Sequence, residues 1–438
     1  MASTLIQRTP SGGNRKKWTW SAWIKFSAVP SANTYLWSGY SGSNNTGYLS
    51  AYFDNNSQLN IGAWTVVYFN TTRAFRDINA WYHIVIVMDT AQATAANRLK
   101  LYVNGVEETA FDSDSRSSIS QDSDMGYNSN GVHTIGGYQS SGSAYVRFDG
   151  IMSHVHFTDG YAYTPSAFGE TDATTGEWKI NTSPSVSYGT TGYWIFKDNA
   201  GITDQSPNSN NWTATGTLTP TKDCPSNVFA TWNILDNYYA SATLTNGNTK
   251  VATNSSAYSA TLTSLGASSG KYYAEFKLID KGSGYCQIGI KGKQPTATSD
   301  GVGAGSDGLA YQLNGNKLLN GSSSSYGTSY DNNDIIGIAM DLDNNRLFFS
   351  KNGTFQDSGD PTSSTGAITI PTSSSGFYFM GISDEHNNGT NTWEANFGNG
   401  YFGTTAVSSA GTNASGNGIF EYDVPTGYTA LSTKGLNE

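Results

Sequence analysis

The sequence predicts an all-β protein made of two antiparallel β-sandwiches in tandem, on the grounds of composition, apolar periodicity and length. Only 13% of its residues are charged, against about 25% in an average soluble protein, while 13% are aromatic and 49 are Gly. Helices need Ala, Leu, Glu, Lys and Arg in bulk, whereas this chain is rich in the Ser, Thr, Asn, Gly, Tyr and Trp of strands and tight turns. Its 438 residues are more than one hydrophobic core usually takes, so we expect two domains.

In the first half, strands alternate with turn signals. The segment Trp18–Phe26 places apolar side chains at every second position, which predicts a half-buried strand. The segment Trp81–Asp89 is almost continuously apolar and β-branched, as in a strand covered on both faces. Asn104-Gly105 is a strong hairpin signal, so we expect two paired strands within Arg98–Glu107. Further strands are expected at 134–138, 146–157 and 193–197.

The second half repeats this pattern. Lys271–Leu278 and Tyr285–Ile290 alternate cleanly, and Asp334–Ser350 reads as a long hairpin that turns at Asn344-Asn345, because Asn tolerates the left-handed backbone of such turns. Strands are also expected at 377–382 and 393–397. Between the halves, Pro220–Pro225 interrupts the apolar alternation, so we place the domains at 1–222 and 223–438.

Charge and hydropathy exclude several classes of partner. A formal net charge of −10 argues against nucleic acid, whose binders present a basic face. The longest apolar stretch, Ile84–Met88, is far shorter than a membrane-spanning helix. The N-terminus has no apolar core of a signal peptide, and Cys224 and Cys286 are too few for a disulfide framework, so synthesis in a host cytoplasm is expected. A charge-poor, Ser/Thr/Asn-rich surface without a secretion signal indicates a virion, which leaves the cell by lysis.

Lys and Arg cluster at one place, Arg8, Arg15, Lys16 and Lys17. We expect this segment to dock on an acidic surface of the particle, and the alternative is a solvated N-terminal arm.

The first half resembles a laminin-G/concanavalin-A-like lectin domain. The resemblance rests on Trp18–Phe26, Trp81–Val85, Leu99–Val106 and Phe148–Gly150, and it implies a two-sheet jelly roll over most of residues 1–170. The acidic position usual after the Phe-x-Gly strand is occupied by Met152-Ser153-His154, so calcium stays an open alternative and no other cofactor is predicted.

A second signature of the same lectin domains arrives late in the chain. Tyr193–Phe196 followed by Asp204–Asn211 is similar to the strand and loop that commonly open them. We therefore expect residues 190–220 to supply a strand that closes the first sandwich, in preference to a third domain.

The second half resembles a SPRY domain, through Gly270–Phe276, Ile288–Ile290, Asp334–Gly353 and Asn396–Gly398. The resemblance implies a second concanavalin-like sandwich, which binds protein surfaces through its loops without catalysis. The succession of the two domains is also similar to capsid or tail proteins of marine tailed phages. It implies a non-enzymatic structural protein, a capsid decoration or tail-associated adhesion module, present in several copies beside other virion proteins.

A glycoside hydrolase of the same fold is the alternative. Laminarinase-type enzymes carry Glu-x-Asp-x-x-Glu on one strand, which supplies nucleophile and acid. The nearest match begins at Glu170, but Thr175 stands where the second Glu belongs, and the odd offset to Glu177 would put the two carboxylates on opposite faces. We therefore predict no catalytic residue.

A histidine pair and two acidic turns are the candidate metal ligands in this sequence. His154 and His156 share a strand face without a neighbouring carboxylate, and structural roles are expected for them as for the other three histidines, His83, His133 and His386. The acidic turns Asp331–Asp334 and Asp341–Asn344 offer oxygen ligands but do not follow an EF-hand register, and Asx residues favour turns without any metal.

Glycan recognition needs exposed aromatic rings for the apolar faces of sugars and polar groups for their hydroxyls. The predicted loops place five aromatic residues at positions suited to a host-surface glycan: Tyr40, Trp64, Tyr138, Tyr330 and Trp393. For each of them, packing in the core or at a sheet edge is the alternative.

Overall fold

The computed structural model describes residues 4–78, 80–140, 143–197, 201–239, 242–254, 259–282, 284–295, 301–384 and 390–437. The chain forms two compact units, residues 1–220 and 221–438. The division between them falls two residues before the boundary predicted from the sequence. The all-β prediction is confirmed, since the described residues contain no α-helix. Four short 3-10 turns accompany the strands: Ala95–Asn97, Arg116–Ser118, Pro165–Ala167 and Gly435–Asn437.

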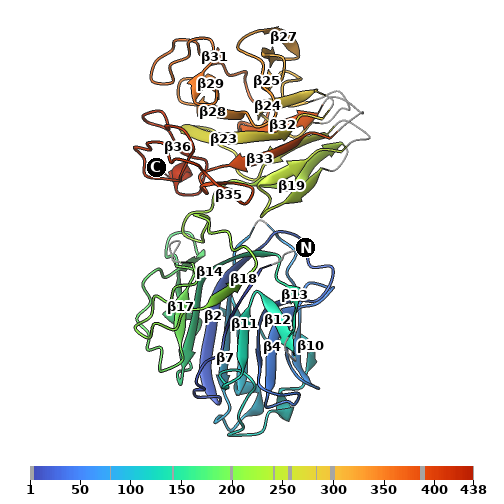
Figure 1. Cartoon of the computed structure of the whole chain (residues 1–438), viewed down its shortest axis with the longest axis vertical. Helices are drawn as coiled ribbons and strands as arrows, with labels where there is room; N and C mark the ends of the chain where they lie inside the picture. Colours follow the sequence, from blue (N-terminus) through green and yellow to red (C-terminus); the bar gives the residue numbers. More distant parts are fainter. Residues whose placement is uncertain are drawn as a thin grey trace. The chain divides into compact units, whose positions relative to one another are not determined.

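The first unit is a sandwich of two antiparallel sheets (Figure 1). The larger sheet has eight strands in the order β10 (Phe111–Asp114), β6 (Val67–Ala74), β5 (Gln58–Ala63), β4 (Tyr48–Phe53), β3 (Thr34–Tyr40), β11 (Val132–Ile135), β1 (Leu5–Arg8) and β18 (Thr213–Thr215). The smaller has six, in the order β17 (Tyr193–Ile195), β14 (Gly150–Asp159), β2 (Lys17–Phe26), β7 (Tyr82–Asp89), β8 (Leu99–Val103) and β9 (Val106–Glu107). Two hairpins lie outside these sheets, β12 (Gly137–Ser140) with β13 (Ser143–Arg147) and β15 (Gly169–Thr171) with β16 (Trp178–Ile180).

The core of this unit follows from period-two alternation on the facing strands. Trp20 and Phe26 of β2 point between the sheets, where they meet Trp37 of β3 and Phe53 of β4 at ring-centroid distances of 6.1 and 4.9 Å. All four side chains are at most 2% exposed, and burial of such large rings supplies much of the driving force for folding.

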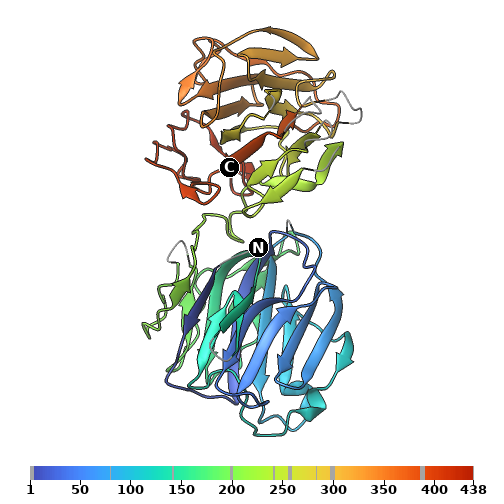
Figure 2. The same ribbon diagram turned by 45° about the vertical axis from the view of Figure 1, so that its right-hand side comes forward.

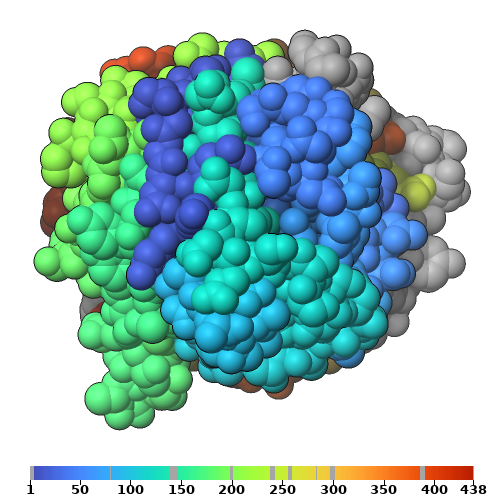
Figure 3. Space-filling view, turned by 90° about the horizontal axis from the view of Figure 1, so that it is seen from below, coloured from blue at the N-terminus to red at the C-terminus, as the bar shows by residue number. Residues whose placement is uncertain are grey.

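Strands from both ends of this unit's chain belong to its sheets. β1 pairs with β11 on one side and with β18 on the other, while β17 pairs with β14 at the edge of the six-stranded sheet. Figure 3 shows the N-terminal segment in dark blue between later, green and teal segments. Residues 190–220 thus contribute one edge strand to each sheet of the first unit.

The second unit is also a sandwich of two sheets (Figure 2). Its seven-stranded sheet has the order β19 (Trp232–Tyr239), β22 (Ser259–Thr263), β32 (Phe379–Asp384), β24 (Cys286–Lys291), β25 (Gly308–Gln312), β26 (Asn316–Leu319) and β27 (Ser322–Ser325). The nine-stranded sheet runs β20 (Thr243–Thr245), β21 (Lys250–Ala252), β33 (Thr392–Asn396), β23 (Lys271–Asp280), β28 (Ile335–Asp341), β29 (Arg346–Lys351) and β30 (Thr354–Phe355), with β31 (Ile368–Thr369) on β29 and β36 (Thr429–Ala430) on β23. A small hairpin joins β34 (Tyr401–Phe402) to β35 (Thr405–Ala406).

The predicted hairpins form where the turn residues indicated them. Asn104 and Gly105 both have positive φ, 48° and 81°, as a two-residue turn of type I′ requires. The long hairpin of β28 and β29 closes through Asn345 at φ 56°.

Two predicted strands are broken in the structure. The strand expected at 134–138 splits into β11 and β12 at Gly136, whose φ of 76° redirects the chain. The strand expected at 146–157 splits into β13 and β14 around Phe148-Asp149.

No strand was predicted between residues 27 and 80, where the structure has β3, β4, β5 and β6. On β4, Tyr48 and Tyr52 face away from the core while Leu49 and Phe53 face into it. Because tyrosine counts as apolar, an outward row of tyrosines hides the apolar-polar alternation that marks a half-buried strand.

No helix in the described ranges has the length and apolar character that crossing a membrane would require.

Candidate functional site

The outer face of the eight-stranded sheet carries a row of aromatic side chains. Cross-strand register places Tyr35 of β3 opposite Tyr52 of β4, and Tyr40 opposite Tyr48. Between these pairs, Ser38 stands opposite Ser50. On β4, residues 48, 50 and 52 alternate with core residues, so they share the face turned away from the core. On β3, a bulge between Tyr35 and Trp37 keeps Tyr35 on the same outer face as Ser38 and Tyr40.

The rings form one continuous path. Tyr35 stacks on Tyr52 and also meets Tyr138 of β12, in both cases with ring centroids 4.9 Å apart. Tyr138 lies 5.6 Å from Tyr48, and Tyr48 lies 5.9 Å from Trp64 in the loop between β5 and β6. The path ends at Tyr40, 6.3 Å from Trp64. We call these six residues the aromatic face: Tyr35, Tyr40, Tyr48, Tyr52, Trp64 and Tyr138.

The six rings of the aromatic face differ in their exposure to solvent. Trp64 is 41% exposed and Tyr48 only 6%, while the other four rings are half-buried. Burial raises the pKa of Tyr35 to about 12, and that of Tyr48 further. These phenols therefore stay protonated at physiological pH and present neutral hydroxyls.

Amide side chains lie beside the aromatic face on β5 and β6. Asp54 accepts hydrogen bonds from Nδ2 of Asn60 at 3.3 Å and from Nδ2 of Asn70 at 3.1 Å, and it also accepts from the backbone of residues 56 and 58. Asn70 donates to Oδ1 of Asn60 as well, at 2.9 Å. This network fixes both amides, and Oδ1 of Asn70 accepts no hydrogen bond within the described part of the chain.

The loop that carries Trp64 is tied to a neighbouring loop. Asn45 accepts from the backbone N–H of Thr65 at 2.8 Å and donates through Nδ2 to the Thr65 hydroxyl at 2.9 Å. These exposed bonds hold the loop after β5 against the loop between β3 and β4, so Trp64 has a defined position beside Tyr40 and Tyr48.

Close packing beneath the aromatic face depends on Gly126. A Cβ there would collide with the backbone of Tyr48, so we expect Gly126→Ala to destabilise the first unit by about 1–3 kcal/mol. Thermal denaturation of the two variants Gly126→Ala and Gly62→Ala measures this, because a Cβ at Gly62 meets nothing nearer than 3.6 Å. Equal losses of stability in both variants would contradict the packing argument.

The two units match known families. Residues 5–166 match the concanavalin A-like lectin/glucanases superfamily, and residues 271–367 match the SPRY domain. The chain carries a concanavalin A-like domain followed by a SPRY domain. The two resemblances expected from the sequence are thereby confirmed, and the units are called the concanavalin A-like unit (1–220) and the SPRY unit (221–438) below.

The chain is also similar to solved structures, at low sequence identity. The SPRY domain of human HERC1 is 17% identical with a TM-score of 0.29, and the match covers 37% of this chain and 96% of that one. A candidate carbohydrate-binding protein from Bacteroides ovatus is 17% identical with a TM-score of 0.33, over 49% of this chain and 56% of that one. The heptameric SAP-like pentraxin of Limulus polyphemus is 19% identical with a TM-score of 0.27, over 37% and 71%.

Three of the five aromatic residues proposed from the sequence come together in the concanavalin A-like unit, namely Tyr40, Trp64 and Tyr138. The exposed position predicted for the other two is wrong. Trp393 of β33 is 0% exposed, and Tyr330 is 3% exposed with its hydroxyl donating to backbone carbonyls of the core. Both rings fill the SPRY core, where they pack 5.9 Å apart.

The remaining members of the aromatic face, Tyr35, Tyr48 and Tyr52, were missed. Their signal is the i, i+4 spacing of Tyr48 and Tyr52 with small or apolar residues between them, which places both on one face of a strand.

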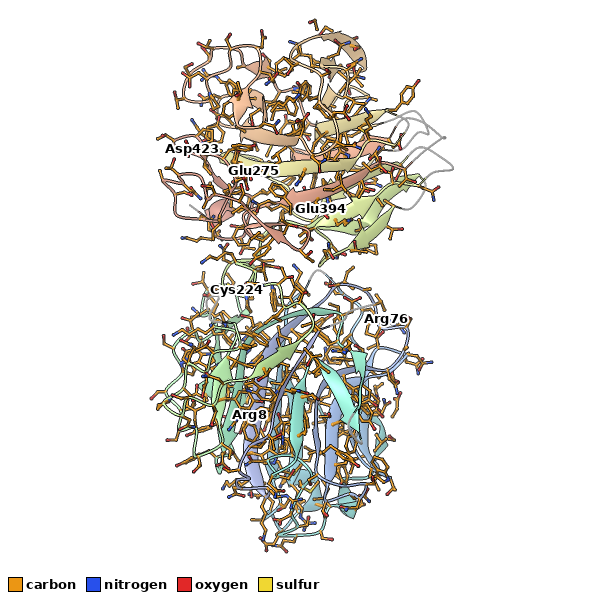
Figure 4. The ribbon with its side chains drawn as sticks, viewed as in Figure 1. Arg8, Arg76, Cys224, Glu275, Glu394 and Asp423 are labelled. Atoms are coloured by element: carbon orange, nitrogen blue, oxygen red, sulfur yellow. The ribbon has the colours of Figure 1, made fainter. Side chains whose placement is uncertain are left out.

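The basic cluster does not form a free arm. Arg8 belongs to β1, between β11 and β18, and its guanidinium donates to the carbonyl of Thr191 at 3.0 Å (Figure 4). Arg15 donates to the carbonyl of Met125 at 2.8 Å, and Lys17 pairs with Asp89 at 3.4 Å. Of the four, Lys16 is exposed, while Arg8, Arg15 and Lys17 are half-buried. The solvated-arm alternative is therefore wrong. Docking on the particle stays a prediction for Lys16 and for the accessible parts of Arg8, Arg15 and Lys17.

The histidines of the concanavalin A-like unit have structural partners. Nδ1 of His83 accepts from the indole of Trp178 at 2.9 Å, so its proton sits on Nε2, which contacts the Ser21 hydroxyl at 2.8 Å. This tautomer cannot activate Ser21 as a nucleophile. His156 bonds the Tyr188 hydroxyl at 2.9 Å, and its ring lies 6.5 Å from that of His154. The fifth histidine, His386, lies outside the described residues.

The carboxylates considered for hydrolysis lie on an exposed hairpin. Glu170 on β15 pairs with Lys179 on β16 at 3.3 Å, and Glu177 is also exposed just before β16. Asp172 accepts backbone hydrogen bonds within the same hairpin. An exposed hairpin offers no enclosed pair of acid and nucleophile of the kind glycosidases use.

The acidic turns of the SPRY unit are occupied by internal partners. Asp331 pairs with Lys281 at 2.9 Å, Asp334 with Lys351 at 3.1 Å, and Asp341 with Lys271 at 3.1 Å. Within the described ranges no three His, Cys, Asp or Glu side chains gather closely enough to hold a metal ion.

Proposed function

We propose that the concanavalin A-like unit binds carbohydrate through the aromatic face. The observation that carries the proposal is the unbroken path of six rings on an outer sheet surface, of which Trp64 is 41% exposed. Rings that serve only the core would be turned inward, as Trp37 and Phe53 are. Rings on an outer surface that contact one another beside fixed amides, one of them exposed and four half-buried, are an arrangement that suits a sugar ring.

Recognition would combine two kinds of contact. The apolar faces of sugar rings would stack on Trp64 and the half-buried tyrosines, which lose little conformational entropy because the rings already hold one another in place. Sugar hydroxyls would donate to Oδ1 of Asn70 and exchange hydrogen bonds with the Tyr40 hydroxyl, which bonds the Ser43 hydroxyl at 3.0 Å.

Binding without catalysis is part of the proposal. It is supported by the exposed, Lys-paired position of Glu170 and by the neutral residues of the aromatic face, which lacks the paired carboxylates of a glycosidase. Release of reducing ends from any polysaccharide that the protein binds would contradict it.

We further propose that the protein is a phage virion component, a capsid decoration or tail-associated adhesion module, in which the SPRY unit binds another virion protein through its loops. The charge-poor, Ser/Thr/Asn-rich composition supports this placement, as does the pairing of a glycan-binding fold with a protein-binding one. Mass spectrometry and immunogold labelling of purified particles test it. Absence of the protein from intact particles would overturn it.

Trp64→Ala is expected to weaken polysaccharide binding at least about tenfold, because it removes the most exposed ring of the aromatic face. Affinity electrophoresis through gels containing single polysaccharides measures the change. Tyr161→Ala is the matched control, since Tyr161 is 42% exposed but follows β14 of the other sheet. Equal retention of wild type and Trp64→Ala would place the carbohydrate site elsewhere.

A further inference from the structure

The strands beneath the aromatic face contain no ionisable acid or base other than tyrosine. The sequences of β3, β4 and β5 are TYLWSGY, YLSAYF and QLNIGA, without a single Asp, Glu, Lys, Arg or His. The three strands are thus free of charged side chains, whereas 13% of the residues in the whole chain are charged.

Charged groups at the margins of the aromatic face are engaged by the protein itself. On one side, Asp54 accepts hydrogen bonds from Asn60 and Asn70, and Arg73 pairs with Glu108 at 2.7 Å. On the other, Arg15 donates to the carbonyls of Met125 and Thr46 and pairs with Asp124 at 3.8 Å. The charges of Arg73 and Arg15 are therefore compensated within the unit. Arg147, on the hairpin that carries Tyr138, has a buried Nη1 without a hydrogen-bond partner in the described part of the chain.

We infer that the ligand of the aromatic face is a neutral polysaccharide, and that uronic-acid or sulfated polymers are excluded; this inference rests on the proposed carbohydrate binding. A carboxylate or sulfate placed over β3, β4 and β5 would lose part of its hydration without contacting a cation on these strands. The free-energy cost of this desolvation would not be offset by an ion pair. The net charge of −10 adds long-range repulsion of polyanions.

The polar groups of the face agree with this ligand class. The Asn70 amide offers an acceptor oxygen, and Tyr35 and Tyr52 offer hydroxyls that stay neutral because burial raises their pKa. Such groups pair with neutral hydroxyls, whereas an anion needs donors of positive charge or clustered N–H groups.

Affinity electrophoresis of the full chain tests the inference with matched polymers. The gels contain dextran, laminarin, agarose or galactomannan as neutral probes, and carboxymethyl dextran, alginate or dextran sulfate as anionic ones. We expect retention by at least one neutral polymer, with an affinity that changes less than about twofold between 50 and 500 mM NaCl, because no ion pair is screened. Retention by the anionic polymers is expected to be absent.

The Trp64→Ala variant separates the possible failures. Retention by an anionic polymer that weakens with salt and is lost in Trp64→Ala would overturn the inference while supporting carbohydrate binding by the aromatic face. Retention by a neutral polymer that is lost in Trp64→Ala supports both. Failure of every polymer to retain the protein overturns the proposed function and the inference together.

Discussion

Acidification from pH 7 to pH 5 is expected to destabilise the concanavalin A-like unit strongly. Three of its histidines are buried in the neutral form, and burial lowers the pKa of His83 to about 3, that of His133 to about 4 and that of His156 well below its ordinary value. Two of them accept hydrogen bonds that protonation would break, His83 from Trp178 and His133 from the backbone N–H of Asn128.

The sign follows from linkage. The unfolded chain takes up these protons near pH 6.5 while the folded unit does not, so stability is complete above pH 6.5 and falls as the pH drops toward the folded-state values. Below pH 6.5, each buried histidine lowers the free energy of unfolding by up to about 1.4 kcal/mol per pH unit, and the three together lower it by about 4 kcal/mol per pH unit. Over two pH units, this loss is comparable with the whole stability of a domain.

Tryptophan fluorescence during acid titration measures this transition, because nine of the 11 Trp residues precede residue 221. A cooperative red shift between pH 6.5 and 4 is expected. His386→Asn serves as the control and should leave the transition in place, since this residue belongs to the other unit. A concanavalin A-like unit that keeps its native fluorescence down to pH 4 would contradict the account.

Replacing Glu275 by Gln is expected to destabilise the SPRY unit by about 3 kcal/mol. Glu275 of β23 is 0% exposed, and its carboxylate accepts from the backbone N–H groups of Glu421 and Tyr422, both at 2.8 Å (Figure 4). It also accepts from the Tyr273 hydroxyl at 3.1 Å and from Nδ2 of Asn396 at 3.3 Å. An amide has only one acceptor oxygen, so Gln would leave buried donors unpaired and release the C-terminal segment from the sheet.

The stability of the SPRY unit should depend on pH in the opposite direction from that of the concanavalin A-like unit. Burial raises the pKa of Glu275 to about 7, although its hydrogen-bond donors lower it in part. The folded unit therefore binds a proton more tightly than the unfolded chain, so this contribution to stability declines as the pH rises from about 4.5 to 7. Calorimetry of wild type and Glu275→Gln measures both effects. Identical midpoints at every pH would refute the role given to this carboxylate.

Local patterns predict the fold class and the hairpins of this chain well. Asn104-Gly105 marks its turn because few residues tolerate positive φ, and Trp18–Phe26 marks its strand because one face is apolar and the other mostly polar. The breaks at Gly136 and Phe148 were not visible, because continuing or interrupting a strand there depends on what lies across from it.

The aromatic face was only half predictable for a physical reason. Trp64 and Tyr40 stand near turn residues, which suggests exposure, whereas Tyr48 and Tyr52 are indistinguishable by composition from core residues. Tyr330 and Trp393 show the same ambiguity in the other direction, because a ring next to a loop can point into the core. The side to which a tyrosine points is decided by the register of its strand, which distant segments determine.

Hydroxyl-radical footprinting of the full chain, with and without a polysaccharide that it retains, shows whether carbohydrate lies on the aromatic face. We expect protection of Trp64, Tyr40 and Tyr52, and no change at Tyr161 or at Tyr285, which is 52% exposed in the SPRY unit. Protection of Tyr285 with unchanged oxidation of Trp64 would contradict it.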